Sequence, residues 1–294
     1  MIKNENTGFK IFYVINYFIL ASFILFTTIP FLFIISASIT KESEIIRDGY
    51  KLIPKELSLE AFSIILGKGS SIFQAYFISI SITVIGTFAS LLVTSMVAYA
   101  IANHNLRHKN KIALFMFFTM LFSGGIVPWY IMCTRYLGLR NNMLALILPM
   151  LLNPWYVFLM RNYFRSIPES ITESARIDGA QIFTILLKII LPLSKPILAT
   201  VGLFYTLAYW NDWWLALMLI EKKELAPLQF TLFRILSSAI FAQTDAGKFT
   251  SVNQMPTESI KMATTVVTIG PIIFIYPFVQ KYFVKGILIG AVKG

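Results

Sequence analysis

Long apolar stretches alternate with shorter polar ones along the whole chain. The apolar stretches cover residues 12–39, 72–102, 112–133, 143–163, 196–220 and 260–282. An α-helix needs roughly 20 apolar residues to cross the hydrocarbon core of a bilayer, and each stretch reaches that length. None alternates with the two-residue period of a membrane β-barrel strand. The pattern therefore predicts an all-α integral membrane protein, with one transmembrane domain over residues 1–294 and about six spanning helices.

Composition agrees with this prediction. Hydrophobic residues make up 57% of the 294 positions and charged residues 13%, about half the share in an ordinary soluble domain. The mean hydropathy is +0.72. The first apolar stretch exceeds the roughly 7–15 residues of a signal-peptide core, so we interpret it as a retained span. Prolines inside or beside the stretches predict kinked helices; they are Pro30, Pro149, Pro154, Pro271 and Pro277.

The net charge of +11 comes from Lys and Arg residues in the polar segments, as is typical beside anionic lipid headgroups, and does not indicate nucleic acid. Six spans would place both termini on the same side as residues 103–111 and 164–195. Lys and Arg are divided almost evenly between the two sides, so the positive-inside rule gives no clear orientation. Acidic residues favour cytoplasmic termini only weakly. On the opposite side, residues 41–71 predict a solvated loop.

Few residues suggest a metal or catalytic site. Cys133 is the one cysteine, which excludes an intrachain disulfide, and is expected to be a small packing residue. His104 and His108 lie with Arg107 and Lys109 in a basic turn and have no third ligand, so we expect no metal. No Walker A loop, HExxH or GxSxG motif occurs, which argues against a membrane-embedded enzyme.

The polar segment 164–195 predicts two short helices. Ser166 and Glu169 have the spacing of a capping box, so a helix should begin just after Ser166. Gly179 can end that helix with a sharp turn. A second amphipathic stretch follows and should stop around Pro192. The two helices would form an L at the membrane surface.

This segment resembles a cytoplasmic motif of the importer permeases of the ATP-binding cassette superfamily. That motif consists of Glu-Ala-Ala, three residues, Gly, nine residues and Ile-x-Leu-Pro. Here Glu173-Ser174-Ala175 is followed after three residues by Gly179, and after nine more by Ile189-Ile190-Leu191-Pro192. Every spacing agrees, and the one departure is the small, helix-compatible Ser174.

The resemblance implies that residues 164–195 are a coupling loop that docks in a cleft on a cytoplasmic ATPase subunit. It thereby implies cytoplasmic termini in a multi-pass protein of the bacterial cell membrane. Because the chain lacks a phosphate-binding loop, ATP and Mg would be bound by the partner ATPase, and this chain would hold no cofactor. The coupling residues implied are Glu173, Ser174, Ala175, Asp178, Gly179, Ile189, Leu191 and Pro192.

Further segments resemble the carbohydrate branch of these permeases, the relatives of the maltose permease. They are residues 177–180, residues 191–196 and the glycine-rich tail within 283–294. The tail is similar to that of the smaller maltose-type subunit, where it reaches the ATPase. Residues 122–128 and 276–286 resemble a narrower group that serves complex oligosaccharides, such as those of aldouronate type from uronic-acid polysaccharides. The tail residues implied to contact the ATPase are Gly286, Gly290, Lys293 and Gly294.

The function implied is half of a translocation path for an oligosaccharide. The implied partners are a second permease subunit in a heterodimer, two copies of the ATPase, an extracellular solute-binding protein and membrane lipid. Residues 243–257 are the candidate loop for the binding protein. One alternative is a permease of this type for a non-sugar solute. The other, an ion-coupled secondary transporter, is disfavoured by the coupling motif and by the lack of internal repeats.

An aromatic segment in the fifth apolar stretch is the candidate solute path. Aromatic faces beside amide and carboxylate groups suit sugars, and a carboxylate within a span normally faces protein or water. Two alternatives stay open: the aromatic residues form an interfacial belt, and the carboxylate pairs with a basic residue of another helix. Gln74, Tyr76 and Asn153 are weaker candidates. The segment comprises Trp210, Asn211, Asp212, Trp213 and Trp214.

Overall fold

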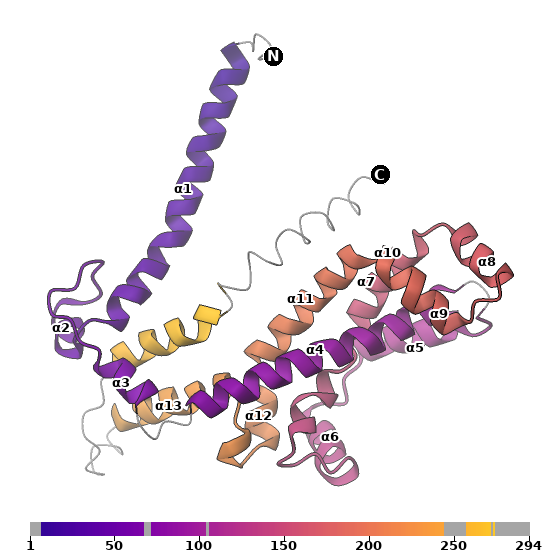
Figure 1. Ribbon diagram of the computed structural model, residues 1–294. Coiled ribbons are helices and arrows are strands. Elements are labelled where there is room, and N and C mark those ends of the chain that lie inside the picture. The colour runs from indigo at the N-terminus through magenta and orange to yellow at the C-terminus, as the bar shows by residue number, and fades with distance from the viewer. Residues whose placement is uncertain (1–6, 68–71, 104–105, 244–256, 272, 274–294) are drawn as a thin grey trace. The chain divides into compact units, whose positions relative to one another are not determined.

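The computed structural model describes residues 7–67, 72–103, 106–243, 257–271 and 273. They form helices joined by loops, with one isolated antiparallel bridge between Thr40 and Leu57 (Figure 1). The prediction of an all-α chain is therefore confirmed over the part of the chain that the structure describes. The chain divides into two compact units, Met1–Ser70 with Arg234–Pro271 and Ser71–Phe233 with Ile272–Gly294.

The first unit begins with α1 (Thr7–Ser38), a single 32-residue helix that contains Pro30. Its apolar side chains are exposed along nearly the whole length: Phe18 is 72% exposed and Phe26 is 78% exposed. Burial starts only near the end, at Ser36. A helix that is apolar all round and packs against little of its own chain is suited to lipid or to another membrane subunit.

A buried carboxylate organises the chain after α1, where the sequence predicted a solvated loop. The segment contains α2 (Glu42–Asp48) and α3 (Glu60–Leu66). Glu44 is 1% exposed, and its carboxylate accepts the backbone N–H groups of Lys55 at 3.1 Å and Glu56 at 2.7 Å. Most of the segment is exposed, as predicted, but the two short helices and the burial of Glu44 were not predicted, because a charge pattern does not reveal which carboxylate the backbone will surround.

A second carboxylate joins this segment to the helix over 257–271, which belongs to the same unit. Glu42 accepts the N–H groups of Glu258 at 2.9 Å and Ser259 at 2.8 Å, so it satisfies donors in the first turn of that helix. Tyr50 donates to the Glu258 carboxylate at 2.7 Å, and Lys261 donates to the same group at 2.7 Å. The unit thus closes through polar contacts between segments more than two hundred residues apart.

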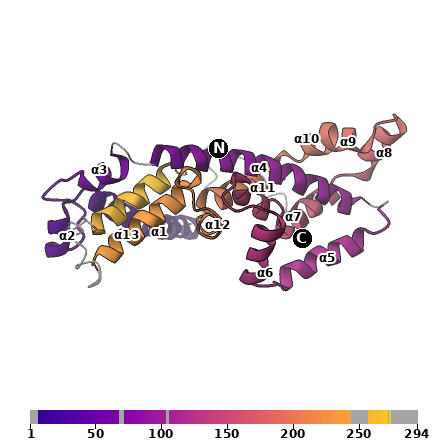
Figure 2. The same ribbon diagram turned by 90° about the horizontal axis from the view of Figure 1, so that it is seen from below.

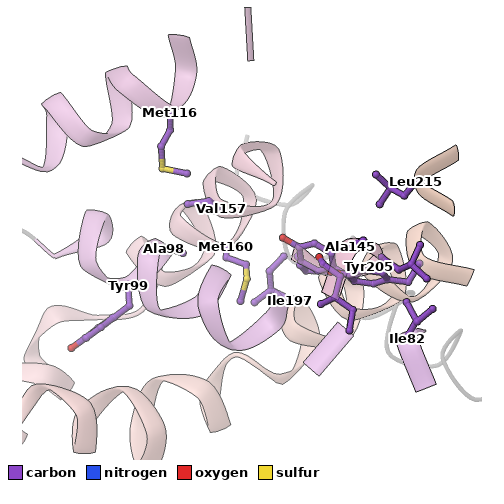
Figure 3. Close-up of a cluster of buried hydrophobic side chains, with 14 of the residues drawn as sticks. Ile82, Ala98, Tyr99, Met116, Ala145, Val157, Met160, Ile197, Tyr205 and Leu215 are labelled. Carbon is purple, nitrogen blue, oxygen red and sulfur yellow. The ribbon is translucent and has the colours of Figure 1, made fainter. Parts of the chain in front are cut away.

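The second unit is built around α4 (Ile72–Ala102), with α7 (Pro154–Arg165) and α11 (Lys195–Asn211) packed along it (Figures 1 and 2). Small residues let the helices approach closely. A Cβ added at Gly86 would lie 2.7 Å from the ring of Tyr209, and one at Gly202 would lie 3.2 Å from Leu91. Buried side chains such as Tyr205 fill the space between these helices (Figure 3).

Two tyrosines of α11 also hold it to its neighbours by hydrogen bonds. The Tyr205 hydroxyl lies 2.7 Å from the hydroxyl of Thr94 on α4. The Tyr209 hydroxyl lies 2.9 Å from that of Ser90 and donates to the carbonyl of Ile147 at 3.1 Å. Buried hydroxyls need such partners, so these pairs fix the rotation of α11 about its axis as well as its distance from α4.

Three of the predicted spans are bent or broken rather than continuous. Within 112–133, α5 (Lys109–Leu121) is separated by a 115° bend from α6 (Ile126–Ile131) and η1 (Met132–Tyr136), and the break contains Gly125 at φ +86°. Glycine adopts that conformation without strain. Cys133 is buried in η1, which confirms its packing role.

Prolines and a carboxylate mark the other two breaks. Residues 143–163 contain η2 (Met143–Leu146) and η3 (Leu148–Met150), which bend by 52° into α7. Pro149 and Pro154 lack the N–H that a continuous helix needs. Residues 196–220 are interrupted at Asp212 and Trp213, after which α12 (Trp214–Leu219), η5 (Lys223–Leu225) and α13 (Leu228–Gln243) follow.

Within the described ranges, Gly8–Ser38 and Ile72–Ala102 are each long and apolar enough to cross a membrane. Up to three more spans are available if each bent helix pair counts as one. Of the predicted span 260–282, residues 260–271 are helical, and most of the rest lies outside the described residues. The number of about six spans stays a prediction.

Candidate functional site

The segment that resembles the coupling motif forms two helices, which we call the helix pair. The first is α8 (Glu169–Ile177). The predicted capping box is wrong: no side chain caps α8, and the Ser166 hydroxyl donates to the carbonyl of Tyr163 at 2.7 Å. Ser166 still belongs to the last turn of α7, and Pro168, in an extended conformation, separates the two helices. Glu169 in the first turn complements the helix dipole.

Gly179 ends α8 as predicted. Its φ is +81°, its N–H donates to the carbonyl of Arg176 at 3.0 Å, and the N–H of Ala180 donates to that of Ala175 at 2.9 Å. This pair of bonds is the Schellman motif, in which glycine supplies the left-handed residue after the helix. The turn therefore has a defined backbone geometry, which makes the two helices a rigid corner.

The exposed side of α8 carries the motif residues that could meet a partner. Glu173 and Ser174 are exposed, and the Ser174 hydroxyl donates back to the carbonyl of Ser170 at 2.9 Å. Ala175 is 9% exposed and faces the chain's own core. Ile177 is 87% exposed, an unusual position for a large apolar side chain. Asp178, the C-cap of α8, and Gly179 are also exposed.

The second helix of the pair comprises α9 (Ile182–Ile185), the π-helical η4 (Leu186–Ile190) and α10 (Leu191–Leu193). It continues past Pro192, and an 87° bend then leads into α11. The π turn lies just before Pro192, which cannot donate a backbone hydrogen bond. Ile189 and Leu191 are half-buried and Pro192 is exposed. Figure 2 shows α8, α9 and α10 close to the C-terminal end of α4.

The candidate solute path lies at the break between α11 and α12. Asp212 is the C-cap of α11, and its carboxylate accepts the N–H of Leu215 at 3.5 Å. It thus meets the positive end of the short helix α12. Asp212 forms no ion pair among the described residues, which gives no support to the alternative of a basic partner. Asn211 is exposed and its side-chain oxygen accepts from Gln229 at 3.3 Å.

The three tryptophans of this segment do not form one aromatic face. Trp210 is 5% exposed and its ring centroid lies 6.5 Å from that of Tyr76. Trp213 is 39% exposed and stacks on Phe233 at 4.7 Å. Trp214 packs on another tryptophan, Trp129, at 4.6 Å. Within this segment Asn211 and Trp213 are exposed, Asp212 and Trp214 are half-buried, and Trp210 is buried.

The weaker candidates have structural partners. Gln74 donates to the backbone carbonyl of Glu224 at 2.9 Å. Asn153 caps α7 by accepting the N–H of Trp155 at 2.9 Å. The tyrosine contacts of α11 were missed by the sequence reasoning. Their signal is two polar pairs at the same spacing of four residues, Ser90 with Thr94 on α4 and Tyr205 with Tyr209 on α11.

Some predicted residues lie outside the described ranges. They are His104, most of the candidate binding-protein loop 243–257, and the tail residues Gly286, Gly290, Lys293 and Gly294. Their roles stay predictions.

The chain is similar to known proteins along nearly its whole length. The model of a family described as "Binding-protein-dependent transport system inner membrane component" matches residues 110–289, a range that contains the helix pair and the aromatic segment. The chain is 36% identical over 285 residues to the "Polygalacturonan/rhamnogalacturonan transport system permease protein YtcP" of Bacillus subtilis (strain 168), which covers 97% of this chain and 99% of that protein. It is 37% identical over 292 residues to "Protein LplC" of the same organism, with 99% and 97% covered.

A solved structure agrees with these sequence relatives. The chain superimposes with a TM-score of 0.79 and 31% identity on a chain from the crystal structure of a bacterial ABC transporter involved in the import of the acidic polysaccharide alginate. The match covers 95% of this chain and 99% of the other.

Proposed function

The chain belongs to the family of binding-protein-dependent transport system inner membrane components, and on that premise we propose how it works in an ATP-driven importer. It is a multi-pass membrane permease, a transport component. In our proposal it supplies half of the translocation path and pairs with a second permease subunit. A solute-binding protein delivers the solute from outside the cell. Two copies of a cytoplasmic ATPase bind ATP and Mg and drive the cycle.

The observation that carries the proposal is the helix pair with its glycine corner. The Schellman turn at Gly179 makes the corner rigid, while Glu173 and Ile177 stay exposed on α8. An exposed carboxylate and an exposed apolar side chain together suit a protein cleft that offers a basic residue and an apolar floor. Movement of the ATPase would then be transmitted through the second helix into α11, which follows it after the 87° bend.

This assignment also sets the orientation that we propose. A helix pair that docks on an ATPase must face the cytoplasm, so the end of α4 at Ala102 and both termini would lie on that side. With cytoplasmic termini, the alternation of spans would place residues 40–71 outside the cell.

An oligosaccharide is the solute class that we propose. Support comes from the relatives, whose names refer to polygalacturonan, rhamnogalacturonan and alginate. In this chain, Asn211, Asp212 and Trp213 would offer an amide, a carboxylate and an aromatic face at the break after α11. Such groups bind hydroxyls and the apolar faces of sugar rings. A non-sugar solute stays the alternative that the transport assay can identify.

Uptake into proteoliposomes tests the proposal. The assembled complex is reconstituted with its ATPase subunits facing the lumen, where ATP is trapped. Uptake of acidic and neutral oligosaccharides is then followed with the binding protein present outside. We expect uptake that requires hydrolysable ATP and the binding protein and that survives collapse of ion gradients. Uptake that persists without ATP and follows an ion gradient would show a secondary transporter instead. ATP-driven uptake of a non-sugar solute alone would overturn the oligosaccharide assignment.

A further inference from the structure

Two cavities lie where the end of α4 meets the helix pair. The larger, of about 710 Å³, lies between the last turns of α4 and the start of α9. Its walls are mainly apolar, with Met96 and Ala100 on one side and Ile182, Phe183 and Leu186 on the other. Met96, Ile182 and Phe183 are 38%, 59% and 61% exposed, so the apolar surface continues out of the cavity. A volume of this size suits an extended apolar ligand.

A second cavity of about 270 Å³ shares three residues with the first: Tyr99, Asn103 and Arg176. Its other walls are more polar and include the charged residues Arg165 and Glu169. The Arg176 guanidinium therefore belongs to the junction between an apolar cavity and a polar one.

Two polar groups at this junction lack partners within the described part of the chain. The Arg176 guanidinium forms no ion pair or hydrogen bond there, and neither does the Tyr99 hydroxyl, although Tyr99 is only 7% exposed. Figure 3 shows Tyr99 pointing away from the other labelled core side chains. The Tyr99 hydroxyl is not among the polar side-chain atoms that are sealed from solvent without a partner in the described ranges, and both residues line the two cavities. The two groups therefore open toward the cavities, where they can donate hydrogen bonds to a ligand that accepts them.

We propose that this junction binds an anionic phospholipid from the leaflet that borders the end of α4. The lipid phosphate accepts from the Arg176 guanidinium and the Tyr99 hydroxyl, and one acyl chain occupies the larger cavity. The position fits, because α4 is long and apolar enough to cross a membrane, and a helix of that length would bring its last turn, near Ala102, to the level of the headgroups. This site goes beyond the proposed transport function and does not depend on the solute.

The local charge favours an anionic headgroup. Residues 106–111 and 161–195 carry eight basic side chains and three acidic ones. Of the acidic ones, Glu169 lines the smaller cavity and would repel a phosphate there. The phosphate should therefore lie at Arg176, away from Glu169. The Glu169 carboxylate can then accept hydrogen bonds from hydroxyl groups of the headgroup, such as those of phosphatidylglycerol. Inorganic phosphate could satisfy the two donors but would leave the apolar cavity empty.

Photo-crosslinking tests the site in the assembled importer. The complex is placed in phosphatidylcholine nanodiscs that contain phosphatidylglycerol with a diazirine on its acyl chain. Peptide mapping should find adducts in residues 96–100 and 182–186. Arg176→Gln should lower this labelling about tenfold, as expected for loss of a charge-assisted hydrogen bond. The matched variant Arg107→Gln changes an exposed cation outside both cavities and should leave labelling within about twofold.

Further arms separate the possible occupants. Ala100→Trp fills the apolar cavity without changing charge and should also reduce the adducts, which keeps the test informative if Arg176→Gln impairs assembly. Excess inorganic phosphate should not compete with the lipid probe. Equal labelling by a phosphatidylcholine probe, unchanged labelling in Arg176→Gln, or no adducts in the complete importer would each overturn the proposal. Crosslinking does not depend on solute uptake. Failure of the lipid site can therefore be distinguished from failure of the proposed transport function.

Discussion

At the scale of single residues, Glu173 and Gly179 have separable roles in the helix pair. Glu173 is exposed and makes no contact that shapes the chain itself, whereas Gly179 determines the direction of the backbone at the corner. Substitution of the first should therefore affect the partner alone. Substitution of the second should change the shape of the lever that the partner moves.

Glu173→Gln keeps the size of the side chain and removes its charge. We expect the ATPase to bind the permease more weakly by about 1.5–3 kcal/mol, the value of a hydrogen bond to a charged group, which is roughly 10- to 150-fold in affinity. Binding of the purified ATPase to the permease in nanodiscs measures this. Glu224→Gln, an exposed carboxylate in η5, is the matched control. Equal affinity in the two variants would contradict a docking role for Glu173.

Gly179→Ala places a Cβ at φ +81°, although there is no atom within 4 Å of it to clash with. The effect is then backbone strain, about 1–2 kcal/mol. We expect fewer solute molecules transported per ATP hydrolysed, because the corner must relax before it can dock. Gly179→Asn should retain more coupling, since asparagine tolerates the left-handed region better. If alanine and asparagine behave alike, strain at this turn is not what matters.

The sequence predicts these residues unevenly. The role of Gly179 was predicted correctly, because a glycine between two amphipathic stretches commonly ends the first helix with a sharp turn. The prediction that Ser166 caps α8 was wrong. A serine three residues before a glutamate can also lie at the end of the preceding helix, and here the Ser166 hydroxyl donates to the carbonyl of Tyr163 in α7. Asp212 was recognised as unusual, but its position at a helix break depends on the neighbouring helices that local sequence does not specify.

At the scale of helices, the contact between α4 and α11 is the best determined part of the second unit. The Tyr209 ring lies over Gly86 and is held there by hydrogen bonds to Ser90 and Ile147. The ring therefore cannot move aside without losing both partners. A side chain at position 86 must push the two helices apart.

Gly86→Ala should consequently destabilise the protein by about 1–2 kcal/mol, although alanine is the better helix former. The midpoint of thermal unfolding of the purified complex should fall by a few degrees, roughly 2–4 °C for each kcal/mol in a chain of this size. Gly270→Ala is the control, because a Cβ there meets no atom within 4 Å. An unchanged or higher midpoint in Gly86→Ala would mean that the Tyr209 ring can yield.

Hydropathy predicts the extent of helices better than their continuity. The stretch 72–102 coincides with α4, because burial in a bilayer selects apolar residues irrespective of their neighbours. The breaks in 112–133 and 196–220 contain Gly125 and Asp212. Residues of these types also occur within continuous spanning helices, so their presence alone does not predict a break. Whether a glycine or a carboxylate interrupts a span depends on what the adjoining helices offer to the freed backbone groups.

At the scale of the whole molecule, the first unit depends on ionised carboxylates that bring distant parts of the chain together. Backbone N–H groups, chiefly that of Glu56, lower the pKa of Glu44. The hydrogen bonds from Lys51 and Arg47 lower the pKa of Asp48 to about 2, and Lys261 with Tyr50 lowers that of Glu258. A group whose pKa is lower in the folded state stabilises that state above its unfolded pKa and ceases to do so as pH falls through its folded pKa.

The contacts of the first unit should therefore loosen as pH falls from about 4.5 toward 2. Hydrogen exchange of the peptide over residues 50–58, corrected for the intrinsic rate at each pH, should show the Lys55 and Glu56 amides losing protection in that window. Glu44→Gln should lose the same protection already at neutral pH. The opposite limit lies in alkali, because Glu258 raises the pKa of Tyr50 to about 12 and its hydrogen bond is lost as pH approaches that value. Protection that is flat between pH 6 and pH 2 would contradict this account.

The length of α4 has a consequence for the membrane around the protein. Its 31 residues extend about 46 Å at 1.5 Å per residue, against a hydrocarbon thickness of roughly 30 Å. Such hydrophobic mismatch is relieved by tilting, kinking or local thickening of the bilayer. The hydroxyl contacts of Tyr205 and Tyr209 tie α11 to α4, so α11 should follow any tilt of α4. We therefore expect a change in lipid acyl-chain length to alter the tilt of α4 and α11 together.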